Sequence, residues 1–241
     1  MELYVSKFIT ISSKKVLGNN SSEIHFVGSN LCFPFVDDEE NLTMESKYSV
    51  DIKHIKSEID SVKNISKTML IKNGEPCLQS LGLKTLAKYL KEKGFFVALE
   101  TYGTKPNLIE SMINNKLVDV VTLKLYTPLQ DNWLKKLNKC SLKTDYKDII
   151  ENIKKTIKIM GESKIKVNVR TIVVPSLVYR KSDLNSIVKN VIGINNFTYE
   201  LVAFDPTKCG KVYSKVNAPT EDFMNEMKLD LEQKFPSLRI R

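Results

Sequence analysis

Short apolar, β-branched segments alternate with amphipathic helical segments along almost the entire chain. Strands are expected, for example, at residues 68–71 and 95–99, and helices with apolar residues on one face at residues 50–62 and 80–93. In such an alternation each helix crosses over between two strands of one sheet, so the strands run parallel. The order of elements therefore predicts an α/β fold around a mainly parallel sheet.

The remaining expected elements continue this alternation to residue 234. They are strands at 3–12, 23–27, 118–126, 164–174 and 197–204, and helices that start at 106 or cover 144–160, 182–191 and 220–234. Counting from the strand at 23–27 gives six βα units, too few to close an eight-stranded barrel. We therefore expect a partial (β/α)6 TIM-like barrel, with an open, curved sheet and the helices outside.

Composition indicates an ordinary globular protein. The chain has 241 residues, of which 42% are hydrophobic and 27% charged, and it contains no Pro/Gly/Ser-rich linker. A single domain over residues 1–241 is expected. The N-terminal residues lack a signal arrangement and no apolar run approaches the ~18 residues that span a bilayer, so we expect a cytoplasmic protein without a membrane partner.

The net charge of +9 comes mostly from lysines that are spread along the predicted helices. No arginine cluster or basic helix with interleaved aromatic residues is present, so a nucleic-acid partner is not expected. The charge is better explained by a solvated, lysine-rich surface.

Four segments after or within predicted strands carry recognisable motifs. Residues 28–37 read Gly-Ser-Asn-Leu-Cys-Phe-Pro-Phe-Val-Asp, and residues 73–79 read Asn-Gly-Glu-Pro-Cys-Leu-Gln. Residues 100–104 read Glu-Thr-Tyr-Gly-Thr, and residues 169–175 read Val-Arg-Thr-Ile-Val-Val-Pro. Because right-handed crossovers bring the loops after parallel strands to one rim, these segments should lie close together.

In this order and spacing the segments resemble the radical S-adenosylmethionine superfamily, in particular its short activating enzymes and the 7-carboxy-7-deazaguanine synthase group. The first family segment reads roughly G-C-N-L-x-C-x-x-C, and its three cysteines hold a four-iron cluster. The matching positions here are Ser29, Phe33 and Val36. A hydroxyl and two hydrocarbon side chains cannot replace three thiolates, so a conventional 4Fe-4S cluster is not expected.

The resemblance also implies a ligand pocket on the rim, where the family's G-G-E-P backbone binds the methionine amino group. The residues that match the family's binding positions are Asn73, Gly74, Glu75, Pro76, Glu100, Thr101, Lys124 and Arg170. Lys124 and Tyr126 stand where the family has an acidic residue and a lysine. S-adenosylmethionine, a derivative of it or another nucleotide therefore remain candidate ligands, and no catalytic residue is assigned.

Three functions remain open. The leading hypothesis is a radical-SAM-like pseudoenzyme, that is, a non-catalytic binding or regulatory subunit. Its partner would be another protein or a paralogous subunit. The second is an active enzyme whose iron-sulfur cluster is relocated to a partner chain or to the rim cysteines Cys32, Cys77, Cys140 and Cys209. The third is an interaction scaffold, in which Phe33, Phe35 and Tyr126 would fill the former site.

Overall fold

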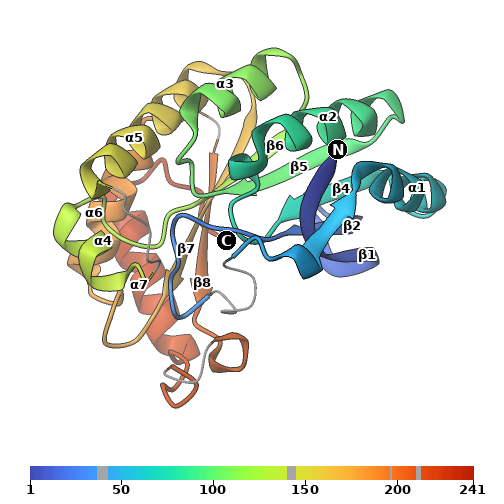
Figure 1. Ribbon diagram of the computed structural model, residues 1–241. Coiled ribbons are helices and arrows are strands. Elements are labelled where there is room, and N and C mark those ends of the chain that lie inside the picture. The colour runs from blue at the N-terminus through green and yellow to red at the C-terminus, as the bar shows by residue number, and fades with distance from the viewer. Residues whose placement is uncertain (37–42, 140–144, 196, 210–212) are drawn as a thin grey trace.

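The structure is a computed structural model that describes residues 1–36, 43–139, 145–195, 197–209 and 213–241. Its sheet has the strand order β3-β1-β2-β4-β5-β6-β7-β8. Six strands run parallel, as predicted: β2 (Asn19–Phe26), β4 (Thr68–Lys72), β5 (Phe96–Thr101), β6 (Val120–Lys124), β7 (Lys166–Val173) and β8 (Phe197–Ala203). They form an open, curved sheet, and the predicted partial barrel is confirmed (Figure 1).

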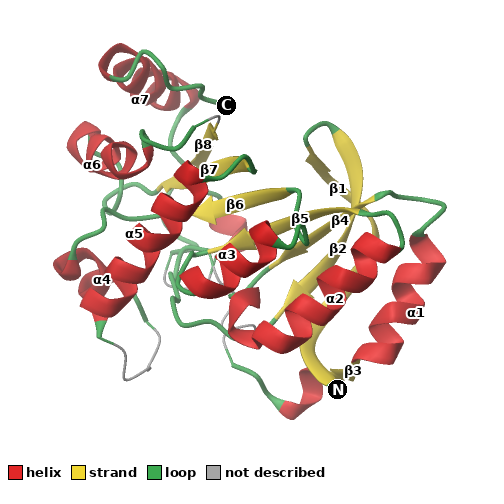
Figure 2. Ribbon diagram, turned by 90° about the horizontal axis from the view of Figure 1, so that it is seen from above, coloured by secondary structure: helices red, strands yellow, loops and turns green. Residues whose placement is uncertain are grey.

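Helices cover the convex face of this sheet (Figure 2). They are α1 (Ile52–Val62), α2 (Ser80–Glu92), α3 (Pro106–Asn114), α4 (Asp131–Leu137), α5 (Tyr146–Glu162), α6 (Lys181–Val191) and α7 (Glu221–Lys234). Alternate strand residues such as Met69 and Ile71 pack against them in the main core, whereas Leu70 belongs to a smaller cluster on the concave face. This period of two is what separates the helix-packing face from the face that lines the site.

A long hairpin precedes the parallel strands and was only partly predicted. β1 (Glu2–Val16) pairs antiparallel with β2, and β3 (Ser49–Asp51) pairs antiparallel with β1 at the sheet edge. The end of β1 lies over the concave face, where Val16 packs against Leu70, Ala98 and Val120. The strand expected at 3–12 thus continues to residue 16, and it closes the amino-terminal end of the open barrel.

Three further details differ from the sequence prediction. The connection after β6 contains the short helix α4, where only an irregular loop was expected. The side chain of Asp145 caps α5 by accepting from Lys147 N; the predicted cap, Thr144, lies outside the described residues. Gly161 does not end α5, which continues to Glu162.

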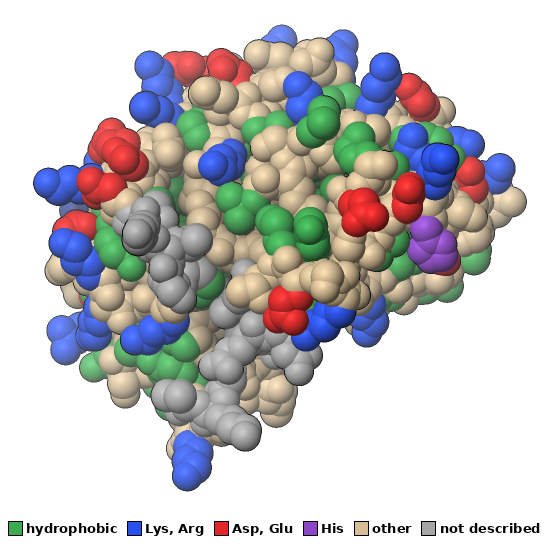
Figure 3. Space-filling model, viewed as in Figure 1, with side chains coloured by type: hydrophobic (Ala, Val, Ile, Leu, Met, Phe, Trp, Pro, Cys, Tyr) green, Lys and Arg blue, Asp and Glu red, His purple; other side chains and the backbone are tan. Residues whose placement is uncertain are grey.

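Charged side chains on the outer surface are dispersed. Figure 3 shows lysine and arginine side chains interspersed with acidic ones on the face it presents, without one large basic patch. Among the described residues, none of the helices combines the length and the apolar character that crossing a bilayer requires.

Candidate functional site

A cavity of about 750 Å³ opens on the concave face near the carboxyl ends of the parallel strands. Five of the eight residues that match the family's binding positions line it, namely Asn73, Gly74, Glu100, Lys124 and Arg170, and so do Val36 and Tyr126. Because β-strand side chains alternate in direction, the positions next to the helix-packing residues of β4 to β8 point into this space. The rim predicted from the order of elements is therefore the place where the chain has a pocket.

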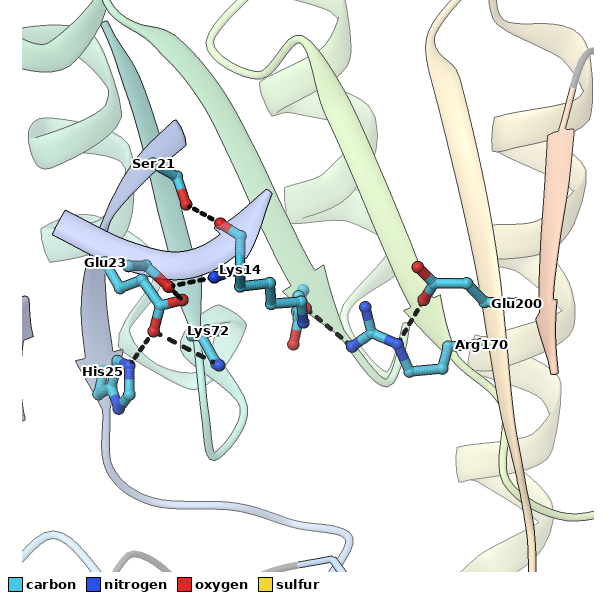
Figure 4. A network of polar contacts seen from close by, with 9 residues as sticks. Lys14, Ser21, Glu23, His25, Lys72, Arg170 and Glu200 are labelled. Atoms are coloured by element: carbon cyan, nitrogen blue, oxygen red, sulfur yellow. Dashed lines mark hydrogen bonds and ion pairs between the residues drawn. The ribbon is translucent and has the colours of Figure 1, made fainter. Parts of the chain in front are cut away.

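Glu100 lies at the centre of a buried ion-pair network (Figure 4). Its Oε1 accepts from Lys14 Nζ at 2.5 Å and from Arg170 Nη1 at 2.8 Å. Arg170 Nε also donates to Glu200 Oε2 at 2.5 Å. Burial alone would raise the pKa of Glu100, but the charges of Arg170 and Lys14 outweigh it and hold the pKa well below its usual range. The carboxylate is therefore ionised at neutral pH.

A second network on the same face is centred on Glu23. Its Oε2 lies 2.5 Å from His25 Nε2 and 3.5 Å from Lys72 Nζ, and its Oε1 accepts from Ser12 Oγ at 2.5 Å. Burial opposes ionisation, but the bonds to His25 and Ser12 outweigh it and lower the pKa of Glu23 to about 2. His25 thus has a structural partner, and its other ring nitrogen lies 3.2 Å from Asn73 Nδ2.

The loop after β4 brings its backbone to the cavity. Asn73 and Gly74 have φ values of 63° and 47°, and Glu75 N donates to Gly28 O at 2.8 Å. The carbonyl of Gly74 accepts from Lys124 Nζ at 2.8 Å, and the same ammonium lies 3.6 Å from the centroid of the Tyr102 ring. Lys124 therefore connects the motif loop of β4 to the loop after β5.

Glu75 lies beneath this loop and does not line the cavity. It is fully buried, and its two carboxylate oxygens accept from Thr101 Oγ1, Cys77 N and Tyr102 N at 2.7–3.0 Å. Pro76 and Thr101 are also buried outside the cavity lining. Glu75, Pro76 and Thr101 were expected to contact a ligand. In the structure they hold the loops together and do not line the cavity.

Four aromatic side chains fill the space beside the motif loop after β2. This aromatic cluster consists of Phe33, Phe35, Tyr102 and Tyr126, all at most 3% exposed. The Phe33 ring has its centroid 5.6 Å from Phe35 and 5.7 Å from both tyrosines. The other two former ligand positions also serve the fold: Ser29 Oγ donates to Leu31 O at 2.6 Å, and Val36 is half-buried against the core.

The three cysteines among the described residues, Cys32, Cys77 and Cys209, do not group into a metal site. Cys77 is buried, its Sγ lies 3.5 Å from Thr101 Oγ1, and burial raises the pKa of its thiol well above the usual value. Cys32 lies in the motif loop, Cys209 is half-buried after β8, and Cys140 lies outside the described residues. Within the part of the chain that the structure describes, no three His, Cys, Asp or Glu residues are grouped as metal ligands. The relocated cluster thus stays a hypothesis.

Sequence reasoning missed several cavity residues. Lys14, Lys72, Glu200 and Arg241 line it but belong to no motif that was singled out. Lys72 and Glu200 could have been found from strand alternation, because they occupy concave-face positions of β4 and β8. Lys14 could not, because the hairpin that carries it over the sheet was not predicted.

A partial barrel of six parallel strands, with its cavity at their carboxyl ends, is the fold of radical S-adenosylmethionine enzymes. The radical SAM methyltransferase from Sphaerobacter thermophilus matches with a TM-score of 0.70 at 12% identity, over 94% of this chain and 67% of that one. QueE from Escherichia coli matches with a TM-score of 0.56 at 12% identity, over 99% and 92%. A domain of pyruvate-formate lyase-activating enzyme from Bacteroides vulgatus gives 0.54 at 12% identity, over 71% and 97%. At such identities the likeness shows the fold.

In sequence, the chain is similar to a Methanocaldococcus jannaschii protein that carries the provisional name of a glycyl-radical enzyme activating enzyme. The two are 28% identical over 228 residues, which cover 94% of this chain and 91% of the other. No protein-family model matches the chain. The resemblance to the radical SAM superfamily, first drawn from the motifs, is thereby confirmed: the chain has the radical SAM fold and is similar in sequence to a protein named as an activating enzyme.

Proposed function

We propose that this protein is a pseudoenzyme of the radical SAM fold, a non-catalytic binding or regulatory subunit that holds a small ligand in its rim cavity. The observation that supports the proposal is the aromatic cluster, which includes Phe33, one of the three positions that the resemblance matches to cluster-binding cysteines. The open cavity next to it supports a retained binding role.

The residues present do not fit a conventional 4Fe-4S cluster. Such a cluster needs three thiolates and supplies the electron that cleaves S-adenosylmethionine through its fourth iron. Phe33 and Val36 have no donor atom, and the hydroxyl of Ser29 is already bonded to a backbone carbonyl. The Phe33 ring also packs against three other rings, so its position is part of the hydrophobic core.

Lys124 changes what the cavity can accept. The resemblance assigns the backbone of residues 73–76 to the amino group of the methionine moiety. Here an ammonium of the protein itself donates to Gly74 O, so a ligand ammonium would have to displace it. Two cations close to one carbonyl repel each other, which argues against S-adenosylmethionine in the family's binding mode.

Anaerobic reconstitution with iron and sulfide tests the proposal. The expected result is no stoichiometric cluster absorbance in the visible range and no 5′-deoxyadenosine after reduction with S-adenosylmethionine. A radical SAM enzyme that retains its three cysteines, treated in parallel, is the positive control. A stoichiometric cluster together with 5′-deoxyadenosine would show that the chain is an active enzyme.

The name of the Methanocaldococcus relative favours a second candidate, an activating enzyme whose cluster has non-standard ligands. This chain would then bind iron through cysteines outside the motif or share a cluster with a partner chain. Repeating the same reconstitution on the Cys77→Ser and Cys209→Ser variants distinguishes the two candidate functions. Iron that one of these substitutions removes would support the second candidate.

A further inference from the structure

The cavity is strongly basic, in contrast to the mixed charge of the outer surface. Its basic lining residues are Lys14, Lys72, Lys124, Arg170, Lys208 and Arg241. Its acidic lining residues are only Glu100 and Glu200. Both carboxylates are already paired with Arg170, and Glu100 also with Lys14. Lys72 is also paired with Glu23, and Lys208 with Asp205, so four carboxylates offset part of the charge of the six basic residues. The smaller excess of positive charge that remains faces the cavity, where it attracts an anion.

The composition of the lining differs from one side of this cavity to the other. Lys72 ends β4 and Lys124 ends β6, and the backbone of Gly74 lies in the loop after β4. Val36 and the last two strands add apolar side chains, with Ile172 on β7 and residues 201–203 on β8. The same side also carries charged residues, namely Arg170, Glu200, Lys208 and Arg241. A ligand that fills the cavity would meet lysines at one end and a wall of mixed apolar and charged residues at the other.

We propose that this cavity binds a nucleoside di- or triphosphate, with the phosphates at Lys72 and Lys124 and the nucleoside against β7 and β8. Lysine ammonium groups act as point charges that suit phosphate oxygens, whereas a flat apolar wall suits a base. The volume of about 750 Å³ is within the range of pockets that enclose such ligands. This inference rests on the proposed function, because it names the ligand class of the same cavity.

The same charges disfavour the alternatives. S-adenosylmethionine carries an ammonium, a sulfonium and one carboxylate, so it brings a net positive charge into a cavity that already has excess positive charge. A free inorganic polyphosphate would satisfy the lysines but leave the apolar side in contact with water. The nucleoside polyphosphate uses both sides.

Isothermal titration of the full chain with four probes tests the assignment: ATP, inorganic triphosphate, adenosine and S-adenosylmethionine, without divalent metal. ATP should bind at least about tenfold more tightly than inorganic triphosphate, since burying a base is worth more than ~1.4 kcal/mol. Adenosine and S-adenosylmethionine should bind at least about 100-fold more weakly than ATP. An absence of ATP binding, or S-adenosylmethionine binding as tight as ATP, would overturn the inference.

Size-matched variants locate the contacts. Lys72→Met and Lys124→Met should each lower ATP affinity about tenfold or more, because each removes a charge-assisted hydrogen bond. Lys88→Met, on the exposed side of α2, removes the same charge far from the cavity and should leave affinity unchanged. Equal losses in all three variants would indicate non-specific attraction and contradict the site.

The apolar side is tested by Val202→Ser, which removes hydrocarbon from the cavity lining without adding charge. It should weaken ATP and leave inorganic triphosphate unchanged. Circular dichroism and thermal unfolding confirm that each variant is folded. If ATP does not bind and reconstitution gives no cluster, only this inference is rejected. If reconstitution gives a functional cluster, the proposed function is rejected, whatever the titration shows.

Discussion

The aromatic cluster and the basic cavity are neighbours at the same rim, yet they differ in nearly every physical respect. The aromatic cluster is buried and closely packed, with four rings within 6.2 Å of at least one other ring, and only Tyr126 among them also lines the cavity. The cavity is open and lined by six basic side chains. Sequence reasoning treated a filled rim and an open pocket as alternatives, but the structure contains both. One part of the rim is thus filled by side chains while the neighbouring part remains open.

Lys124 lies at the boundary between the two regions. Its ammonium is close to the Tyr102 ring of the aromatic cluster and also lines the cavity. A cation over an aromatic face is attracted by the ring quadrupole, so a buried lysine is tolerated there. Substituting one boundary residue therefore affects both regions, and cleaner tests change one region at a time.

The largest effect is expected for Phe33→Ala. Removing a buried phenyl ring that contacts three other rings should lower the free energy of unfolding by about 3–5 kcal/mol. Guanidinium denaturation measures this, with Leu229→Ala, 57% exposed on α7, as the control that should change little. A loss below about 1 kcal/mol would mean that the aromatic cluster is not part of the stabilising core, and that this half of the rim is available to a ligand.

Glu75→Ala should follow closely, although Glu75 contacts no ligand in the structure. The substitution leaves the buried amides of Cys77 and Tyr102 and the hydroxyl of Thr101 without their acceptor. Each unsatisfied group costs about 1–3 kcal/mol, so a total near 3 kcal/mol is expected. Glu110→Ala, at an exposed position of α3, is the matched control.

If Glu75→Ala left stability unchanged but abolished ligand binding, its role would be contact with the ligand and the division into two regions would fail at this residue. Measuring the unfolding free energy and ATP affinity on the same preparation distinguishes these outcomes. We expect a large change in stability, and a change in affinity only through displacement of the loop at 73–76.

The fold was largely predictable because its signal is local and repeated. Within each βα unit the spacing of apolar residues changes from the strand period to the helix period. Six parallel strands could therefore be counted without knowing how they pair. The extent of β1 could not be predicted, because the contacts that extend it past residue 12, such as Val16 with Ala98, are far apart in sequence. Tertiary burial of this kind overrides local propensity.

The site was predictable only as a location. The motifs correctly indicated the rim, and five of the eight matched residues line its cavity. They could not show that Glu75 would turn inward to backbone amides while Glu100 would meet Lys14 from the hairpin. The partners of a side chain depend on which strands are neighbours and on what covers the concave face. Neither can be predicted from the sequence of a single segment.

Gly74→Ala should have an intermediate effect on the cavity side. At φ 47° a Cβ would lie 2.5 Å from the carbonyl oxygen of Gly28, which is backbone and cannot rotate away. We expect a loss of about 2 kcal/mol, with weaker ligand binding because the loop must move. Gly18→Ala is the control: its φ of 88° is equally left-handed, but a Cβ there would meet nothing within 4 Å.

The test compares the loss of stability and of ligand affinity in the two glycine variants. Gly18→Ala should cost only about 1 kcal/mol of backbone strain and leave ligand affinity unchanged. Thermal unfolding and titration of both variants measure the two quantities. Equal effects would mean that the close approach of residues 74 and 28 does not shape the cavity.

The smallest expected effect is a pH dependence that comes from Glu23, on the wall opposite the aromatic cluster's loop. Because its pKa is about 2 in the folded chain and ~4.3 in an unfolded one, the folded state binds fewer protons between these values. The stabilisation is complete above the unfolded pKa and is lost as the pH falls from about 5 to about 2. Glu23→Gln removes this contribution.

The stability difference between the parent and Glu23→Gln should therefore shrink by about 1–2 kcal/mol between pH 6 and pH 3, as measured by denaturation at each pH. Glu100 remains in both proteins, so its own acid sensitivity cancels in the difference. Glu110→Gln, which removes a carboxylate at an exposed position of α3, is the matched control. A constant difference for Glu23→Gln would mean that Lys72 and His25 do not stabilise the carboxylate, and that the concave face is hydrated enough to screen its charges. The phosphate-binding role of Lys72 would then depend on a more exposed ammonium than the structure shows.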